Sequence, residues 1–337
     1  MADLEPMPDE PVLNEIRFQT EDIAFASEDL VTCTGCKRQN PPNRLNCLYC
    51  GNSLPVHADR IDLIKPVLRP IEPWEVGFSV IARTDIARLP VNLTVVERVT
   101  GLGPEKLKAV VSAGQPMPLA MFGSRHEAEV MAAALEKLGV PTVVISDGLL
   151  SPVQPPVRLR AITINDESLT FADFNSGNLI DVPRAELVLI VQGIISESRT
   201  DQLEKKRRGK ESKVLDEVET ENDQAVVDIY LRTDAVGFRV MLAGFDFACL
   251  GDDKSYIAAE NIRRLVTVLH ELVPEAKVAS DYRKLRVALE PVWPIDTRKD
   301  SLGLQRSGFG RVEFGNRISS SNFRQLNRFS RLQWHLL

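Results

Sequence analysis

Four of the five cysteines lie within eighteen positions near one end of the chain. They form two Cys-x2-Cys pairs, whose members are Cys33, Cys36, Cys47 and Cys50. A Cys-x2-Cys turn places two sulfurs on one side of an ion, and zinc prefers four ligands in a tetrahedron. Because four thiolates leave no position for water or substrate, the pattern predicts one structural zinc ion.

The residues around the cysteines suit such a site. Asn40-Pro41-Pro42-Asn43 lets the chain reverse between the two pairs, and Gly51 follows the second pair, where a left-handed residue relieves crowding. A segment of about 22 residues cannot bury a useful core, so metal binding, worth about 10 to 16 kcal/mol in comparable peptides, must supply the folding free energy. Residues 31–55 are therefore predicted to form a zinc ribbon.

The spacing Cys-x2-Cys-x3-Asn-x6-Cys-x2-Cys resembles the Ran-binding-protein type of zinc finger, and the stretch also resembles the short zinc ribbons of many bacterial proteins. Lys37, Arg38 and Arg44 make this segment basic, with no acidic residue among them. Basic groups of this kind favour contact with phosphates. Nucleic-acid binding through these three residues is therefore one candidate function.

The whole chain has 337 residues, of which 44% are hydrophobic and 26% charged, as in ordinary globular proteins. It contains no apolar run of the length of a signal peptide or a membrane span. We therefore expect a cytoplasmic protein without a membrane partner. In that reducing compartment, paired cysteines indicate a metal site more often than a disulfide.

Charge and proline mark the segments between domains. The acidic N-terminus, residues 1–30, and the basic tail, residues 293–337, are both poor in apolar residues and are expected to be disordered. Residues 56–75, with three prolines, are expected to be a semi-rigid linker.

Residues 76–148 show a regular alternation of element types. Strands are predicted at 78–82, 118–122 and 142–146, and helices at 93–100, from Pro104, and from 125 to 138. Ser124 and Glu127 form a capping box for the third helix, and Gly139 ends it. The order β-α-α-β-α-β predicts a small two-layer domain with three helices on one face of a sheet.

The segment "FSVIARTDIARLPVNLTVVERVTGLGPEKLKAVV", residues 78–111, resembles the C-terminal domain of the bacterial ribosomal stalk protein. In that family the domain recruits translation factors through a helix that carries an aliphatic residue beside basic ones. Leu93 matches the aliphatic position and Lys108 one basic position, whereas Glu97 stands where the family has a basic residue. The resemblance implies a protein partner that contacts these three residues.

Residues 157–292 contain about seven short runs rich in β-branched and aromatic residues, then a helix with apolar residues from Ala258 to Leu272. Asp252 or Asp253 is the expected cap of this helix. Seven strands and a closing helix resemble a pleckstrin-homology-type barrel. Residues 199–224, charged and nearly without apolar residues, are expected to be a disordered insertion. Cys249 alternates with Phe245 and Phe247 in the last predicted strand and is expected to be a buried apolar residue.

The sequence shows no glycine-rich phosphate loop, no catalytic triad order and no ligand set with an open metal position. We therefore expect an α+β multi-domain protein that is not an enzyme and has no small-molecule substrate. Its predicted function is that of a zinc-binding adaptor with a protein partner, associated with the ribosome or translation. The alternative is an RNA-binding protein that uses the basic ribbon and the arginine-rich tail.

Overall fold

The computed structural model describes residues 25–55, 64, 71, 75–83, 86–151, 154–207, 210–233, 236–308 and 311–337, without the side chains of 203–207, 210–216, 305–308 and 311–313. The chain divides into two compact units, Met1–Ile64 and Lys65–Leu337. Most of the predicted acidic N-terminus, residues 1–30, and of the predicted linker, residues 56–75, lies outside the described residues. Helices and strands both occur, as expected for an α+β protein.

The first unit contains a short ribbon. Strand β1 (Val31–Thr32) pairs antiparallel with β2 (Gln39–Asn40). Its buried apolar cluster consists of only four residues, Val31, Cys33, Cys47 and Leu54. Since two of the four are cysteines, the described part of this unit has almost no core apart from the residues around its sulfurs.

The second unit begins with the small module expected at residues 76–148. Its elements are β3 (Phe78–Ala82), the 3-10 turn η2 (Ile86–Arg88), α1 (Leu93–Thr100), α2 (Pro104–Ser112), β4 (Pro118–Phe122), α3 (Arg125–Lys137) and β5 (Thr142–Ser146). The strands form an antiparallel sheet in the order β4-β3-β5. The predicted cap of α3 is observed, because the Ser124 side chain accepts a hydrogen bond from the Glu127 N–H. Gly101, in the left-handed conformation, ends α1.

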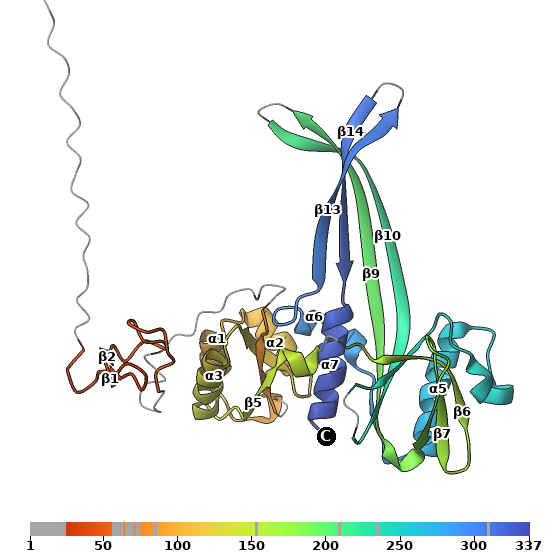
Figure 1. Ribbon diagram of the computed structural model, residues 1–337, viewed down its shortest axis with the longest axis horizontal. Helices are drawn as coiled ribbons and strands as arrows, with labels where there is room; N and C mark the ends of the chain where they lie inside the picture. Colours follow the sequence, from red (N-terminus) through yellow and green to blue (C-terminus); the bar gives the residue numbers. More distant parts are fainter. Residues whose placement is uncertain are drawn as a thin grey trace, which may run out of the picture. The chain divides into compact units, whose positions relative to one another are not determined.

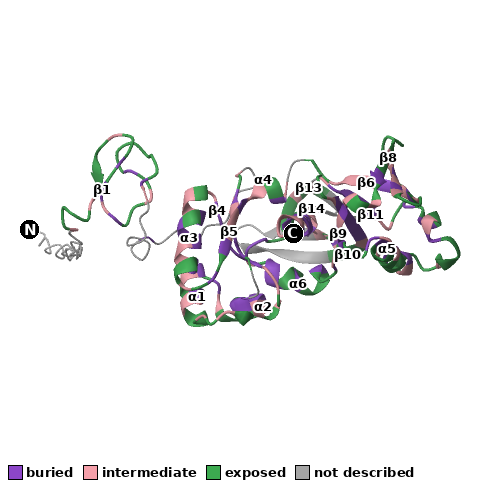
Figure 2. Cartoon of the chain, turned by 90° about the horizontal axis from the view of Figure 1, so that it is seen from below, coloured by how far each residue is buried: buried purple, intermediate pink, exposed green. Residues whose placement is uncertain are grey.

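A large curled sheet follows (Figure 1). Its strand order is β13-β14-β9-β10-β11-β6-β7-β8, with β12 beside β9, and in the described residues its two end strands do not pair with each other. The first strands are β6 (Val157–Ile164), β7 (Ser168–Asp173), β8 (Leu179–Pro183), β9 (Leu187–Arg207), β10 (Lys210–Leu231) and β11 (Phe238–Met241). Helix α5 (Ala258–Leu272) buries one side, with Ile262, Leu265 and Leu269, and leaves the other exposed (Figure 2).

The segment before α5 differs from the prediction. Residues Phe247–Asp253 form the 3-10 helix η4 rather than a strand, and Cys249 lies in it half-buried. The Asp246 side chain starts η4 by accepting a hydrogen bond from the Ala248 N–H. Helix α5 begins after Ile257, and neither Asp252 nor Asp253 caps it. Instead the Ser255 main chain exchanges two hydrogen bonds with the Asn261 side chain.

The prediction of a disordered insertion at residues 199–224 is wrong. These residues continue β9 and β10, which pair antiparallel from Leu187 opposite Leu231 to Arg207 opposite Lys210. Strand β14 (Arg311–Ser321) pairs with the other side of β9, and β13 (Asp296–Gly308) pairs with β14. We call the four-stranded part formed by residues 196–207, 210–224, 296–308 and 311–321 the arm; Figure 1 shows it extending away from the helices of this unit.

The prediction of a disordered tail at residues 293–337 is also wrong. The tail supplies β13, β14 and the helix α7 (Phe323–His335), in which every residue from Gln325 to Gln333 is buried. Figure 1 places α7 between the small module and the curled sheet. The helix therefore lies inside the unit, packed on several sides.

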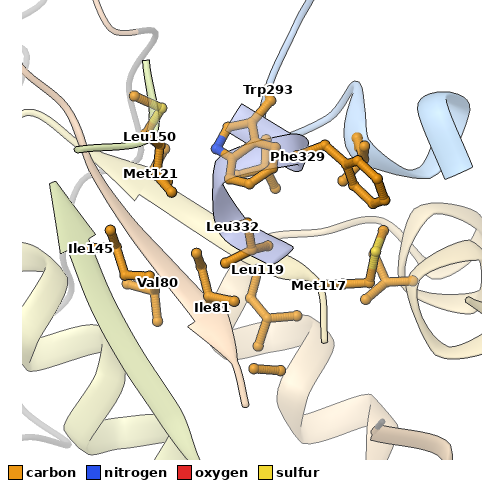
Figure 3. Close-up of a cluster of buried hydrophobic side chains, with 14 of the residues drawn as sticks. Val80, Ile81, Met117, Leu119, Met121, Ile145, Leu150, Trp293, Phe329 and Leu332 are labelled. Atoms are coloured by element: carbon orange, nitrogen blue, oxygen red, sulfur yellow. The ribbon is translucent and has the colours of Figure 1, made fainter. Parts of the chain in front are cut away.

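The small module and the tail share one core. Trp293, fully buried, donates a hydrogen bond from its indole Nε1 to Ser79 Oγ of β3, at 2.9 Å. Figure 3 shows Trp293, Phe329 and Leu332 beside the sheet residues Val80, Ile81 and Leu119. The sheet of the module is therefore covered on both faces, and the expected independent two-layer domain is part of a larger body.

Strands β9 and β10 separate this core from a second one. Leu189, Val191 and Tyr230 belong to the first core, whereas Ile190 and Ile229 belong to the second, which lies beneath α5. Alternate side chains of a strand point to opposite faces, so both faces of the two strands are covered here. The remaining elements are α4 (Asp147–Leu150), η3 (Arg184–Glu186), β12 (Lys277–Ala279) and α6 (Tyr282–Leu289).

Candidate metal centre

The predicted convergence of the four cysteines is confirmed. The sulfurs of Cys33, Cys36, Cys47 and Cys50 all lie within 4.8 Å of one another. The Cys33 and Cys50 sulfurs are 3.6 Å apart, and those of Cys36 and Cys47 are 3.5 Å apart. Four sulfurs in this arrangement can hold one metal ion.

The two Cys-x2-Cys turns have the same backbone construction. In the first, the Lys37 N–H donates to the Cys33 carbonyl at 2.9 Å; in the second, the Gly51 N–H donates to the Cys47 carbonyl at 3.0 Å. Lys37 and Gly51 both adopt the left-handed conformation, with φ of 62° and 73°. Gly51 has the conformation expected from the sequence. Lys37 is the one described residue other than glycine with a positive φ.

Asn40 connects the two turns. Its side chain is fully buried, and its Oδ1 accepts a hydrogen bond from the Leu48 N–H at 2.8 Å. Its Nδ2 donates to the Arg38 carbonyl at 3.0 Å. The amide thus orients the second turn relative to the first, as outer hydrogen bonds do around metal ligands. The sequence pattern included this asparagine, but its role was not predicted.

The pKa values of three thiols reflect backbone hydrogen bonds, burial and the neighbouring sulfurs. The hydrogen bond from the Cys36 N–H lowers the pKa of the Cys33 thiol, although burial acts to raise it. Burial disfavours the Cys47 thiolate, but the N–H groups of Tyr49 and Cys50 outweigh it and lower its pKa to about 6. At Cys50 the Asn52 N–H favours the thiolate, yet burial and the other three sulfurs prevail and raise the pKa to about 12. A cation between the sulfurs would relieve this repulsion and allow all four to ionise.

The three basic residues predicted to contact nucleic acid, Lys37, Arg38 and Arg44, are all exposed on the ribbon. The Arg38 guanidinium lies over the Tyr49 ring, 4.7 Å from its centroid. Tyr49 and its neighbour Leu48 are 57% and 56% exposed. Sequence reasoning missed these two residues, although their position between Cys47 and Cys50 fixes them at the surface of the second turn.

The residues predicted to contact a protein partner lie in the second unit. Leu93 and Glu97 lie one turn apart on α1, where Leu93 is 40% exposed and Glu97 half-buried. Lys108 is exposed on α2. The fifth cysteine, Cys249, belongs to η4 in this unit, and burial raises the pKa of its thiol.

Comparisons with known protein families, with curated proteins and with solved structures gave no match to this chain. Among the described residues, no helix has the length and apolar character needed to cross a membrane. The site must therefore be interpreted from its own geometry.

Proposed function

We propose that the protein is a zinc-stabilised adaptor without catalytic activity, in which the ribbon and the small module present surfaces to other macromolecules. The cysteine cluster is the observation that carries this proposal. A tetrahedral zinc ion with Zn–S bonds of about 2.3 Å requires sulfurs about 3.8 Å apart. The separations of 3.6 Å between Cys33 and Cys50 and of 3.5 Å between Cys36 and Cys47 are close to this value. A four-thiolate site has no open position for substrate, which supports a structural ion.

The small core of the ribbon supports the same role for the ion. Only Val31 and Leu54 accompany two cysteines in its buried apolar cluster. Metal binding of about 10 to 16 kcal/mol would then supply most of the free energy that folds this unit. The ion would hold the exposed Arg38, Leu48 and Tyr49 side chains in position.

Metal analysis of the purified full chain tests the zinc site. We expect one zinc ion per chain, lost in the variant Cys36→Ser. The matched control Cys249→Ser should retain the ion, because Cys249 lies in η4 of the second unit. A protein without stoichiometric zinc, or with another metal after purification in zinc-replete medium, would contradict the proposal.

A partner for the small module is the second part of the proposal. The exposed positions of Leu93 and Lys108, with Glu97 half-buried beside Leu93 on α1, are compatible with the docking role implied by the resemblance to the ribosomal stalk domain. Affinity capture of the tagged chain from its native host, with ribosomes collected as a separate fraction, should recover a defined partner that resists salt. Leu93→Ala or Glu97→Lys should weaken that association, and Glu105→Lys on the exposed side of α2 serves as control. Recovery of no specific partner would count against this part.

RNA binding by the ribbon is the second candidate function. Arg38 stacked on Tyr49, with Lys37 and Arg44 also exposed, combines a cation with an aromatic platform. Four thiolates and a divalent ion together carry two negative charges, which offset part of this positive charge. Fluorescence anisotropy with a single-stranded RNA should therefore show weak binding that falls steeply with salt and is lost in Arg38→Glu. Absence of binding at low ionic strength would exclude this candidate.

A further inference from the structure

Strand β10 has an edge without a neighbour along the arm. It pairs with β9 along its length, but its other side pairs with β11 only from Val226 to Ile229. In the described part of the chain, no strand occupies that side between Lys210 and Gln224. The main-chain N–H and C=O groups on this side are therefore open to a further strand.

The same stretch carries a row of carboxylates. Residues 217–223 read Glu-Val-Glu-Thr-Glu-Asn-Asp, with an acid at every second position. Because alternate residues of a strand share a face, the four acids lie on one face of the arm, spaced about 7 Å apart. All four are exposed. Their partners on β9 include small hydroxyl residues; the pairs are Glu219 with Thr200, Glu221 with Ser198 and Asp223 with Ser196.

The charges on the two faces of the arm differ. On the opposite face Asp201 forms ion pairs with Arg199 at 2.8 Å and with Arg317 at 2.7 Å. On the acidic face, Glu219, Glu221 and Asp223 form no ion pair with any described residue. These three carboxylates therefore have no countercharge paired with them in the described part of the chain. A second copy paired to this edge in register would place carboxylates opposite carboxylates, which is unfavourable.

The acidic row leads into a pocket at the base of the arm. The pocket has a volume of about 230 Å³, and its lining includes Glu221, Asp223, Glu197 from β9 and Glu290, which follows α6. Arg286 is the one basic residue in the lining. Because the side chain of Glu197 alternates to the opposite face of the arm, the carboxylates of Glu221, Asp223 and Glu290 give the pocket a formal charge of −2. The Arg286 side chain is held by Ser196, to whose Oγ it donates a hydrogen bond at 3.0 Å.

The pocket also has apolar walls. Val287 and Ile295 line it and are 67% and 37% exposed. A lysine or arginine side chain combines an aliphatic stem with a charged end, and such side chains cover apolar surface while their charge reaches polar groups. The lining therefore matches a single basic side chain.

We propose that the free edge of β10 binds an extended, lysine- or arginine-rich segment of another protein as an added strand. Basic residues at alternate positions of that segment would lie over Glu219, Glu221 and Asp223, since both strands have the same period of two. The last basic side chain would enter the pocket beside Val287 and Glu290. This surface belongs to the second unit, so binding to it does not depend on the metal centre.

A synthetic peptide can test this directly. Fluorescence anisotropy would compare the labelled peptide Lys-Thr-Lys-Val-Lys-Thr-Lys with its isomer Lys-Lys-Lys-Lys-Thr-Val-Thr, both added to the full chain at the same ionic strength. The alternating peptide should bind about tenfold more tightly, because all four of its lysines can share the face of the acidic row, whereas only two lysines of the isomer can. Equal binding of the two peptides would overturn the proposal in favour of non-specific attraction.

Backbone methylation tests the added strand. Only every second N–H of an added strand points toward its neighbour. N-methylation of the Thr and Val nitrogens in one peptide, and of the inner Lys nitrogens in another, should therefore abolish binding of one and spare the other. If both methylated peptides bind like the parent, no strand is added and the proposal fails.

Variants of the chain locate the surface. The triple variant Glu219→Gln, Glu221→Gln, Asp223→Asn should reduce peptide affinity about tenfold. The control variant Asp252→Asn, Glu271→Gln, Glu275→Gln removes the same charge from exposed positions elsewhere and should leave affinity unchanged. Both should be checked for retained folding by circular dichroism. Equal loss of peptide affinity in the two variants would show that the peptide does not bind at the edge of β10. Self-association of the free protein that the first triple variant abolishes would also contradict the proposal, because a second copy would then occupy this edge.

Discussion

The guanidinium of Arg328 donates two hydrogen bonds to the carboxylate of Asp147, at 2.6 and 2.9 Å. The two residues are 181 positions apart in the chain. Asp147 is the first residue of α4, directly after β5, and Arg328 lies in the middle of α7. The ion pair thus fastens the small module to the C-terminal helix, with side chains only 9% and 16% exposed.

Removal of the Arg328 side chain should destabilise the second unit. In Arg328→Ala the Asp147 carboxylate would remain largely buried without its partner, which is expected to cost about 3 kcal/mol of unfolding free energy. Urea denaturation followed by circular dichroism measures this. The matched control Arg125→Ala breaks the exposed pair with Glu129 and should change stability by less than about 0.5 kcal/mol. Equal losses of unfolding free energy in the two variants would show that the buried ion pair stabilises the protein no more than the exposed one.

Asn40 should tune the metal site without binding the ion. Asn40→Ala removes the acceptor of the Leu48 N–H and frees the second turn to shift, so we expect zinc affinity to fall about 10- to 100-fold. Competition with a chromogenic chelator measures the change. Asn43→Ala, at an exposed position of the same loop, is the control and should leave the affinity unaltered.

Acid should release the ion from the ribbon. Ligand thiols must lose their protons to bind, so affinity falls as pH falls. The raised pKa of Cys50, about 12 before metal binding, makes its proton the main competitor, whereas Cys47, with a pKa of about 6, is already mostly ionised at neutral pH. A zinc-sensitive dye should report progressive release between about pH 7 and pH 5. Retention of the ion throughout that range would be inconsistent with a thiolate site.

The metal site was predictable from sequence because its information is local. Each Cys-x2-Cys turn is built by adjacent residues, and eighteen positions contain all four sulfurs. The capped helix α3 was predictable for the same reason, since the Ser124 hydroxyl accepts its hydrogen bond from the Glu127 N–H only three residues away.

The C-terminal helix was missed because most of its buried residues are polar or charged. The buried residues of α7 include Asn327, Ser330 and Arg331. In a sequence, residues of these types predict an exposed surface. Their partners come from far along the chain: Ser330 donates to Asp228, and Arg239 donates to Asn327. Leu326, Phe329 and Leu332, spaced by three, were the available apolar signal. A polar network that closes only in the folded state cannot be recognised from one of its segments.

The arm was missed because the low apolar content of residues 199–224 predicts disorder, although their alternating pattern favours a strand. A stretch with few apolar residues is normally disordered, since it cannot offset the entropy of ordering. In the arm, β10 and β14 pair with the two sides of β9 through main-chain hydrogen bonds. This pairing orders the strands without an apolar core. The strict alternation of acids from Glu217 to Asp223 was the strand signal in that segment.

Two substitutions at Lys37 should separate its backbone role from its charge. The left-handed conformation costs a residue with a Cβ about 1 kcal/mol, and glycine avoids that cost, as Gly51 does in the second turn. Lys37→Gly should therefore strengthen zinc binding about fivefold, whereas Lys37→Ala keeps the strain and should leave it nearly unchanged. Both remove the same charge, so RNA affinity, if the ribbon binds RNA, should fall equally in the two. Weaker zinc binding by Lys37→Gly than by Lys37→Ala would show that the lysine side chain itself supports the turn.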